Sequence, residues 1–395
     1  MRLVIINASV FDGVSEDLAD GPVHVADGRI TGIGGAAEDG EHVVDARGGT
    51  VLPGLIDAHF HAYGIGLDLL GIEARPLSYV ALAGARRLGS ALRRGFTTVR
   101  DVAGGDAGLA KAIAEGLLAS PRYLYTGPGL SQTGGHGDAR DVDLDVCACH
   151  SHMVEVVDGV DAVRRAVRDR FRRGAHAIKL MTSGGVMSLT DPIRIPQYSA
   201  EEVRAATDEA TRRGSYVAAH AYSAEAIRHS VQNGVRSIEH GNLLDADTAA
   251  VMASHNAYLV PTLATYNAID RRGAELGLAP VSQAKNREVL DAGRVAIELA
   301  RAAGVPIGFG TDLMGDLEAE QLNGLRLQSE VDGPLNALRS ATSVNAELLG
   351  HLDLGRIEVG FAADLLIVDG NPLTDLSVVW DPQRPRTVIL AGVPV

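Results

Sequence analysis

Short apolar runs alternate with longer amphipathic stretches through most of this chain, from about residue 55 to residue 311. Each apolar run has the length of a buried β-strand, and turn residues separate it from the stretch that follows. Eight runs are predicted to be strands: Leu55–His61, Thr97–Asp101, Tyr123–Thr126, Ala177–Met181, Tyr216–His220, Ser237–His240, Tyr258–Pro261 and Ile307–Thr311.

The stretches between these runs repeat their apolar residues with a helical period. Helices are predicted over residues 78–94, 106–119, 158–173, 199–213, 223–233, 245–255 and 282–303. Ser199 followed by Glu202 forms a capping box for one of them. Strands that alternate with helices in this number predict an α/β fold, a (β/α)8 TIM barrel. The alternative is a doubly wound sheet, but no Gly-x-Gly-x-x-Gly follows the first strand.

Both ends of the chain read as β-structure that is too short to form a stable domain alone. Near the N-terminus the apolar runs are Leu3–Ile6, Val23–Val25, Ile30–Ile33 and His42–Val44, and near the C-terminus Asp364–Asp369 and Thr387–Leu390. We therefore expect residues 1–56 and 355–395 to pair into one small β-sandwich domain. Residues 57–354 would then form the barrel domain.

Polar side chains that can bind metal recur where the predicted strands end. His59 and His61 alternate on the first strand and share one face with Asp57. Further along the chain, strand ends carry Lys179, His220, His240 and Asp312. Each residue alone has an ordinary explanation, such as a core histidine, a helix cap or a lysine that reaches solvent. Together they fall at the same rim of one barrel, which predicts a metal site.

Composition narrows the partners. The chain has 395 residues and a formal net charge of −14, which argues against nucleic acid and anionic membranes as partners. Two cysteines, Cys147 and Cys149, do not make a disulfide framework, and a cytoplasmic location is expected. The first residues lack the pattern of a signal peptide, and no run of 18 apolar residues occurs.

Lysine is rare, because only Lys111, Lys179 and Lys285 occur among 36 basic residues. Lys111 and Lys285 lie in polar contexts and are expected at the surface, whereas Lys179 lies in an apolar strand. Four imidazoles and a carboxylate suit Zn²⁺ or a similar ion. A neutral amine beside two cations can take up CO₂, and the carbamate formed on Lys179 could bridge two divalent ions.

Several motifs resemble those of the amidohydrolase superfamily along the whole chain. The motifs are Pro53–His61, Ile178–Met181, His220–Tyr222, Ser237–Gly241, Gly310–Asp312 and Gly355–Leu365. This resemblance implies that His59, His61 and Asp312 hold one metal ion and that His220 and His240 hold a second. It also implies that carboxylated Lys179 bridges the two ions, as in the dinuclear branch of that superfamily.

A narrower resemblance runs through Gly134–Asp138, Thr182–Ser188 and Asp191–Ile193. These stretches are similar to the metal-dependent Xaa-Pro and Xaa-Arg dipeptidases, which are carboxypeptidase-like, and to the ochratoxin-hydrolysing amidases. The expected reaction is cleavage of an amide next to a free carboxylate by a metal-bridging hydroxide, with Asp312 as the proton shuttle. The alternatives are an ochratoxin-type amidase, a lactonase or cyclic amidase, and a metal-free scaffold.

The substrate is expected to be a dipeptide or another small molecule, bound by a homo-oligomer. His136, in a Gly-rich loop, could steady the carbonyl oxygen, and Tyr222 could bind a substrate carboxylate. Backbone N–H groups of 183–185 could face an anion. Arg100 and Asp101 read first as a structural ion pair. Cys147, Cys149, His150 and His152 are crowded for a zinc site and predict instead a loop over the barrel mouth.

Overall fold

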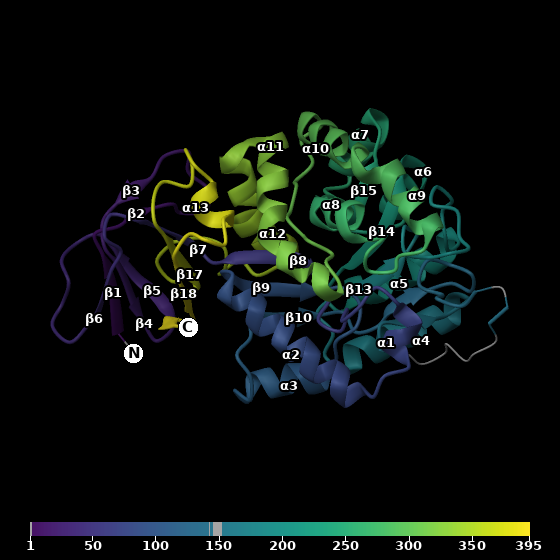
Figure 1. The fold of residues 1–395 in the computed structure, drawn as a ribbon, viewed down its shortest axis with the longest axis horizontal. Coiled ribbons are helices and arrows are strands. Elements are labelled where there is room, and N and C mark those ends of the chain that lie inside the picture. Colours follow the sequence, from purple (N-terminus) through teal and green to yellow (C-terminus); the bar gives the residue numbers. More distant parts are fainter. Residues whose placement is uncertain (1, 142, 145–151) are drawn as a thin grey trace.

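The computed structural model describes residues 2–141, 143–144 and 152–395, and it confirms the predicted fold class. A (β/α)8 barrel occupies the centre and one side of the molecule, and two sheets built from the chain ends lie at the opposite side (Figure 1). Both termini lie at that same side (Figure 1). Among the described residues, no helix has the length and apolarity that a membrane crossing needs.

Parallel strands form the barrel wall in the predicted order. They are β8 (Leu55–Phe60), β9 (Phe96–Asp101), β10 (Arg122–Tyr125), β11 (Gly129–Ser131), β13 (Ile178–Met181), β14 (Val217–Ser223), β15 (Ser237–Leu243) and β16 (Tyr258–Val260). The third position is split, because β10 pairs with β9 whereas β11 pairs with β13. A short outer strand, β12 (Val154–Val156), pairs with β11.

The eighth position differs from the prediction, because Ile307–Thr311 closes the barrel without forming a regular strand. Its pairing consists of one bridge between Leu259 and Ile307 and of two bonds to the first strand, from Ala58 N to Phe309 O at 2.9 Å and from Thr311 N to His59 O at 3.3 Å. The Asn345 side chain replaces the missing rungs. It accepts from Phe309 N at 3.1 Å and donates to the carbonyls of Ile56 and Phe309 at 2.8 Å each.

Helices surround the wall close to the predicted bounds. They are α2 (Leu77–Arg93), α3 (Ala107–Ala114), α4 (Val160–Arg172), α5 (Ala200–Arg212), α6 (Ala224–Gln232) and α7 (Ala246–Ser254). Ser199 and Glu202 form the predicted capping box. The stretch predicted as one helix over 282–303 is two helices, α9 (Pro280–Leu290) and α10 (Ala292–Ala302), with Asp291 between them.

Several helices were not predicted. They are α1 (Leu69–Glu73), α8 (Leu263–Arg272), a 3₁₀ turn (Gly315–Glu320), α11 (Gln321–Arg339), a π-helical segment (Ser340–Val344), α12 (Asn345–Leu349) and α13 (Ser377–Trp380). Two of them matter for the site. Helix α1 supplies residues beside the barrel mouth, and α8 follows the seventh strand and supplies Thr265 and Tyr266 to its lining.

The chain ends form two sheets. One contains β5 (Arg29–Ile33), β4 (Val23–Ala26), β1 (Arg2–Ile6) and β6 (His42–Asp45), and the other β19 (Val393–Pro394), β18 (Arg386–Leu390), β17 (Leu365–Val368), β7 (Thr50–Pro53), β2 (Ser9–Val10) and β3 (Ala19–Asp20). Alternation gives the second sheet two apolar faces. Val51 and Leu365 pack in the core between the sheets, whereas Leu52 and Leu366 pack against the barrel.

Candidate active site

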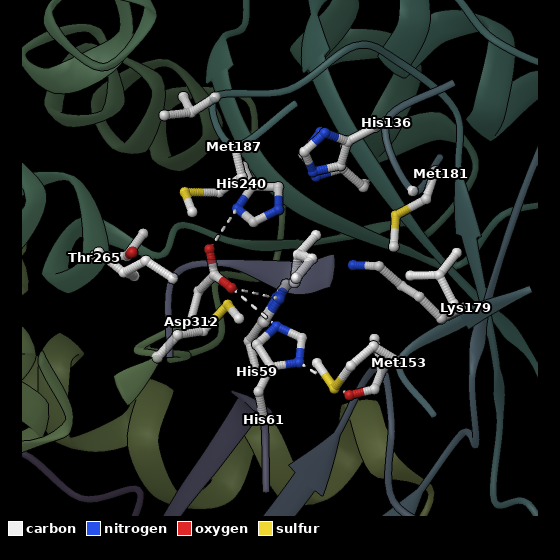
Figure 2. A pocket seen from close by; sticks show the side chains of 18 of the residues that line it. His59, His61, His136, Met153, Lys179, Met181, Met187, His240, Thr265 and Asp312 are labelled. Atoms are coloured by element: carbon white, nitrogen blue, oxygen red, sulfur yellow. Dashed lines mark hydrogen bonds and ion pairs between the residues drawn. The ribbon is translucent and has the colours of Figure 1, made fainter. Parts of the chain in front are cut away.

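One pocket at the carboxyl ends of the barrel strands brings together every side chain predicted for the site, and Figure 2 labels all of them except His220 and Tyr222. The predicted side chains are His59, His61, His136, Lys179, His220, Tyr222, His240 and Asp312. All but His136, which lies in a loop after β11, come from strands or strand ends, so parallel strands carry these side chains to one rim, as predicted. The Lys179 amine points into the same space as the histidines (Figure 2).

His59, His61 and Asp312 form a compact metal-binding group. Each offers one ligand atom, and these three atoms lie within 4.8 Å of one another. Asp312 Oδ1 is 2.9 Å from His61 Nε2 and 3.4 Å from His59 Nε2 (Figure 2). The backbone of Asp312 has a φ of 54°, an unusual value for a residue other than glycine, and its N–H donates to His59 O at 2.8 Å. This bond ties the Asp312 turn to the end of β8.

Each of the four histidines has one ring nitrogen engaged by an acceptor outside the predicted ligand set. The other nitrogen is available to that set, and the one of His61 lies 2.9 Å from Asp312 Oδ1. The engaged pairs are His59 Nδ1 with Glu239 Oε2 at 2.7 Å, His61 Nδ1 with Ala103 O at 3.2 Å, His220 Nε2 with Gly184 O at 3.2 Å, and His240 Nδ1 with Thr262 Oγ1 at 2.7 Å. Such partners fix the tautomer and orientation that metal-binding histidines require. The donor set therefore fits divalent cations.

Burial and the neighbouring side chains together set the charges of this cluster. It holds the pKa of His220 and of His240 well below the ordinary histidine value, so both rings are neutral and can act as ligands. Burial also lowers the pKa of Lys179, to about 8, which favours the neutral amine. At Asp312, burial is outweighed by the charge of His59 and by hydrogen bonds from both neighbouring histidines, so its pKa falls well below the usual range.

Glu239 and Arg100 support His59 from below, and neither role was predicted. Both side chains are fully buried, and Arg100 Nη2 donates to Glu239 Oε1 at 2.7 Å. The predicted ion pair between Arg100 and Asp101 is wrong, because adjacent strand residues face opposite ways. Asp101 instead accepts from Tyr123 OH at 2.8 Å. The sequence does hold a signal for both residues, because Arg100 and Glu239 are charged residues inside runs predicted to be buried strands.

Asp57 lies below the pocket rather than in it. It accepts from Thr311 Oγ1 at 2.6 Å, from Gln321 Nε2 at 2.9 Å and from His59 N at 3.1 Å. Burial raises its pKa. Asp57 thus joins the first strand to the eighth position and holds the backbone that carries His59 and Asp312.

His136 lies in the predicted loop, where it is half-buried and packed against its neighbours. Its ring stacks on His220 with centroids 4.0 Å apart. A Cβ on Gly185 would lie 2.1 Å from the His136 ring, so only glycine leaves room for it. The backbone N–H of Gly184 donates to Ile195 O, so the predicted anion site at 183–185 loses one of its donors.

A closed set of hydrogen bonds runs from the His136 backbone to its imidazole. His136 N donates to Gln197 Oε1 at 2.9 Å, and Gln197 Nε2 donates to Asp191 Oδ2 at 2.9 Å. The Ser188 hydroxyl donates to Asp191 and lies 2.9 Å from His136 Nδ1. Lys285, predicted at the surface, instead donates to the carbonyls of Gly185, Ser188 and Asp191 at 2.7–3.0 Å. These contacts fix the ring.

Tyr222 is buried and is bonded through its hydroxyl to Tyr266 at 2.9 Å. Its ring stacks on His240 with centroids 5.2 Å apart. Burial raises the Tyr222 pKa well above the usual tyrosine value, so the hydroxyl keeps its proton and can donate it. Thr262 and Tyr266 belong to the same cluster and were not predicted.

The rest of the pocket lining is apolar. Four of the six methionines of the chain line it, with leucine, valine and isoleucine beside them: Met153, Met181, Met187, Met314, Leu67, Leu69, Val154, Val186 and Ile269. Among the described lining residues no arginine occurs, and Lys179 and Asp312 are the only lysine and carboxylic acid. Flexible thioethers adapt to apolar groups of varied shape.

The predicted loop over the barrel mouth lies mostly outside the described residues, since these do not include Cys147, Cys149 and His150. His152 is described, and its backbone N–H donates to Glu73 Oε2 at 2.6 Å. Met153 N donates to the other oxygen of Glu73 at 2.7 Å. Helix α1 therefore fixes the segment that brings Met153 to the pocket.

Known proteins are similar to this chain in sequence and fold. Residues 50–395 match the amidohydrolase family. The ochratoxinase of Aspergillus niger is 32% identical over 99% of this chain and 86% of its own length. A solved prolidase in complex with N-methylphosphonate-L-proline is 42% identical, with a TM-score of 0.97 over 100% of this chain and 99% of that one. A solved Xaa-Pro dipeptidase with bound methionine is 31% identical, with a TM-score of 0.89 over the whole of both chains.

Proposed function

This chain belongs to the amidohydrolase family and is a metal-dependent hydrolase of C–N bonds, and we propose that it cleaves small dipeptides or N-acyl amino acids next to a free carboxylate. The first-choice substrates are Xaa-Pro-type dipeptides with apolar side chains. An ochratoxin-type amidase is the second candidate, favoured by the likeness to ochratoxinase along the whole chain. A homo-oligomer in the cytoplasm stays a prediction.

The observation that carries the proposal is the convergence of six ligand side chains on one pocket. His59, His61 and Asp312 suffice for one cation. His220 and His240 would leave a second cation with only two protein ligands. A carbamate on Lys179 would supply the missing anionic oxygens, and it would form when the neutral amine bonds to the carbon of CO₂ and releases one proton. The low pKa of this buried amine supports that step.

Bound divalent cations polarise a carbonyl and lower the pKa of water, so hydroxide becomes available near neutral pH. The chain's own residues supply the remaining chemistry. Asp312 lies beside His59 and His61 and can hold a proton and deliver it to the leaving amine. Because its pKa is low, this role depends on proximity to the reacting atoms. His136 lines the same pocket and would contact the scissile carbonyl.

The lining selects the substrate class. Methionine and aliphatic side chains surround the ligand cluster, so the groups on either side of the amide are expected to be apolar. Among the described lining residues, no arginine is present to bind the free carboxylate. Tyr222 remains as a hydroxyl donor, with the cations, for that group. Substrates with lysine, arginine or acidic side chains should be poor.

The test is a screen of zinc-, manganese- and cobalt-loaded protein against Xaa-Pro dipeptides, N-acyl amino acids, lactones and cyclic amides. Release of free amine should be fastest for apolar dipeptides or N-acyl amino acids. Metal analysis should find about two ions per chain in wild type. Asp312→Asn serves as the matched inactive control. Protein that holds two ions but releases no amine from any amide would contradict the proposal, and hydrolysis of lactones or cyclic amides alone would favour those alternatives. Metal-free, inactive protein would favour the scaffold.

A further inference from the structure

A row of side chains connects the ligand His240 to Tyr222. His240 Nδ1 is 2.7 Å from Thr262 Oγ1, and Thr262 donates to Tyr266 OH at 3.2 Å. Tyr266 OH is 2.9 Å from Tyr222 OH. Thr262, Tyr266 and Tyr222 are 0%, 1% and 2% exposed, so the protein groups themselves must satisfy these hydroxyls.

The direction of donation along this row follows from the histidine end. A neutral imidazole that gives one nitrogen lone pair to a cation carries its proton on the other nitrogen. With Nε2 of His240 free for the ion, Nδ1 holds the proton and donates to Thr262. The Thr262 hydroxyl has one proton, which then goes to Tyr266. Tyr266 in turn has one proton, and it goes to Tyr222.

The tyrosine end shows what this direction leaves free. In that direction the Tyr222 oxygen accepts from Tyr266 at 2.9 Å, and the proton of Tyr222 is not used within the row. A phenol whose oxygen accepts a hydrogen bond still has its own proton to donate. Among the described residues no protein acceptor for that proton is found, and Tyr222 lines the pocket. The unused hydrogen-bond donor of the row, the O–H of Tyr222, is therefore available to a substrate in the pocket.

We infer that Thr262 and Tyr266 are positioning residues, which transmit the tautomer of His240 to Tyr222 so that its O–H donates to the substrate's carboxylate. This inference rests on the proposed function, which supplies a substrate with a free carboxylate. The protein can thereby bind an anionic group although no arginine occurs among its described lining residues. The same row links carboxylate binding to metal loading, although Tyr222 is itself not a ligand.

The test compares 3-phenylpropionate with 3-phenylpropionamide, two probes that differ only in the anionic group, by calorimetric titration of zinc-loaded protein. Wild type should prefer the acid. Tyr266→Phe and Tyr222→Phe should each reduce that preference about 10-fold, and the double variant should be no worse than Tyr222→Phe alone because the residues act as one unit. Zinc content should stay at the wild-type value.

Tyr198→Phe is the matched control, because it also removes a buried tyrosine hydroxyl, one that donates to Val157 O at 3.0 Å away from the site. Its acid preference should equal that of wild type. Amide hydrolysis with an unchanged acid preference in Tyr266→Phe would overturn the inference and leave the proposed function standing. If Tyr266→Phe lost the acid preference but wild type hydrolysed no amide, the inference would stand and the proposed function would be overturned.

Discussion

The two ends of the barrel both gather histidines, but with opposite surroundings. At the carboxyl end, four imidazoles each have an acceptor on one nitrogen, and Asp312 lies among them. At the amino end, His176 stacks on His351 with ring centroids 5.4 Å apart. There His176 Nε2 is buried without a hydrogen-bond partner.

The difference shows what turns clustered histidines into a metal-binding group. Of the described residues, only His59, His61 and Asp312 place three ligand atoms within 4.8 Å. At the amino end Arg100 and Arg236 lie near His176 and disfavour a further cation. A carboxylate that converges with the rings, and an acceptor that fixes each ring, therefore distinguish the rim from an ordinary histidine contact.

The largest expected effect is that of Lys179→Ala. This variant removes the amine that would carry the carbamate bridge, so kcat/KM should fall at least about 1,000-fold, the scale expected for losing a group that organises a metal centre. Metal analysis should show fewer than two ions per chain. Short carboxylates such as acetate or propionate should restore part of the activity by replacing the carbamate.

His351→Ala is the counterpart at the amino end and should keep kcat/KM within about two-fold of wild type, as expected for a side chain away from the chemistry. Wild-type turnover in Lys179→Ala would remove the bridge from the proposal. A loss in His351→Ala as large as that in Lys179→Ala would remove the distinction between the two ends.

Glu239→Gln should have the second-largest effect, because it changes the acceptor that orients His59 without touching the pocket. Loss of such an outer partner lowers metal affinity about 10- to 100-fold. It also leaves Arg100 buried without its countercharge, which destabilises a fold by about 3–5 kcal/mol. Chelator competition measures the first effect and urea unfolding of the metal-free protein the second.

Glu347→Gln is the matched control near the amino end, where Glu347 forms a half-exposed pair with Arg356 at 2.8 Å. Such a pair contributes less than about 1 kcal/mol, and metal affinity should not change. If Glu239→Gln bound zinc as tightly as wild type, this would contradict the idea that the hydrogen-bond acceptors on the histidines distinguish the rim from the amino end.

The sequence was sufficient for the rim because strand alternation and strand ends are local properties. His59 and His61 share a face within one strand, and parallel strands carry Lys179, His220 and His240 to the same edge. The family motifs then supplied the grouping of ligands.

The sequence was insufficient wherever a partner lies far along the chain. Asn345 replaces the ladder at Phe309 from 36 residues away, so the eighth strand was predicted as regular. Lys285 has polar neighbours in sequence, yet it binds carbonyls of residues 94–100 positions earlier. Tyr266 lies on a helix that was not predicted. The pattern of apolar and polar residues along a short stretch carries no information on such long-range contacts, because these depend on the paths of loops and helices.

The smallest effect on activity is expected for His176→Phe, which keeps an aromatic ring between His351 and Tyr216 but removes the titratable group. Turnover at pH 7 should stay within about two-fold of wild type, because the residue lies at the barrel end away from the pocket. Its effect should appear instead in the pH dependence of the free energy of unfolding.

Burial, with His351 and Arg100 nearby, lowers the pKa of His176 to about 4 in the folded protein. The unfolded chain binds this proton near pH 6.5, so between those values it holds more protons than the folded state, and stability must fall as the pH falls. The loss is at most about 3 kcal/mol between pH 6.5 and pH 4, and it is absent above pH 6.5. In metal-free protein, urea unfolding at each pH should show a shallower acid slope for His176→Phe than for wild type. Parallel slopes would mean that this histidine titrates as freely as an exposed one, and the contrast between the two barrel ends would then lose its electrostatic basis.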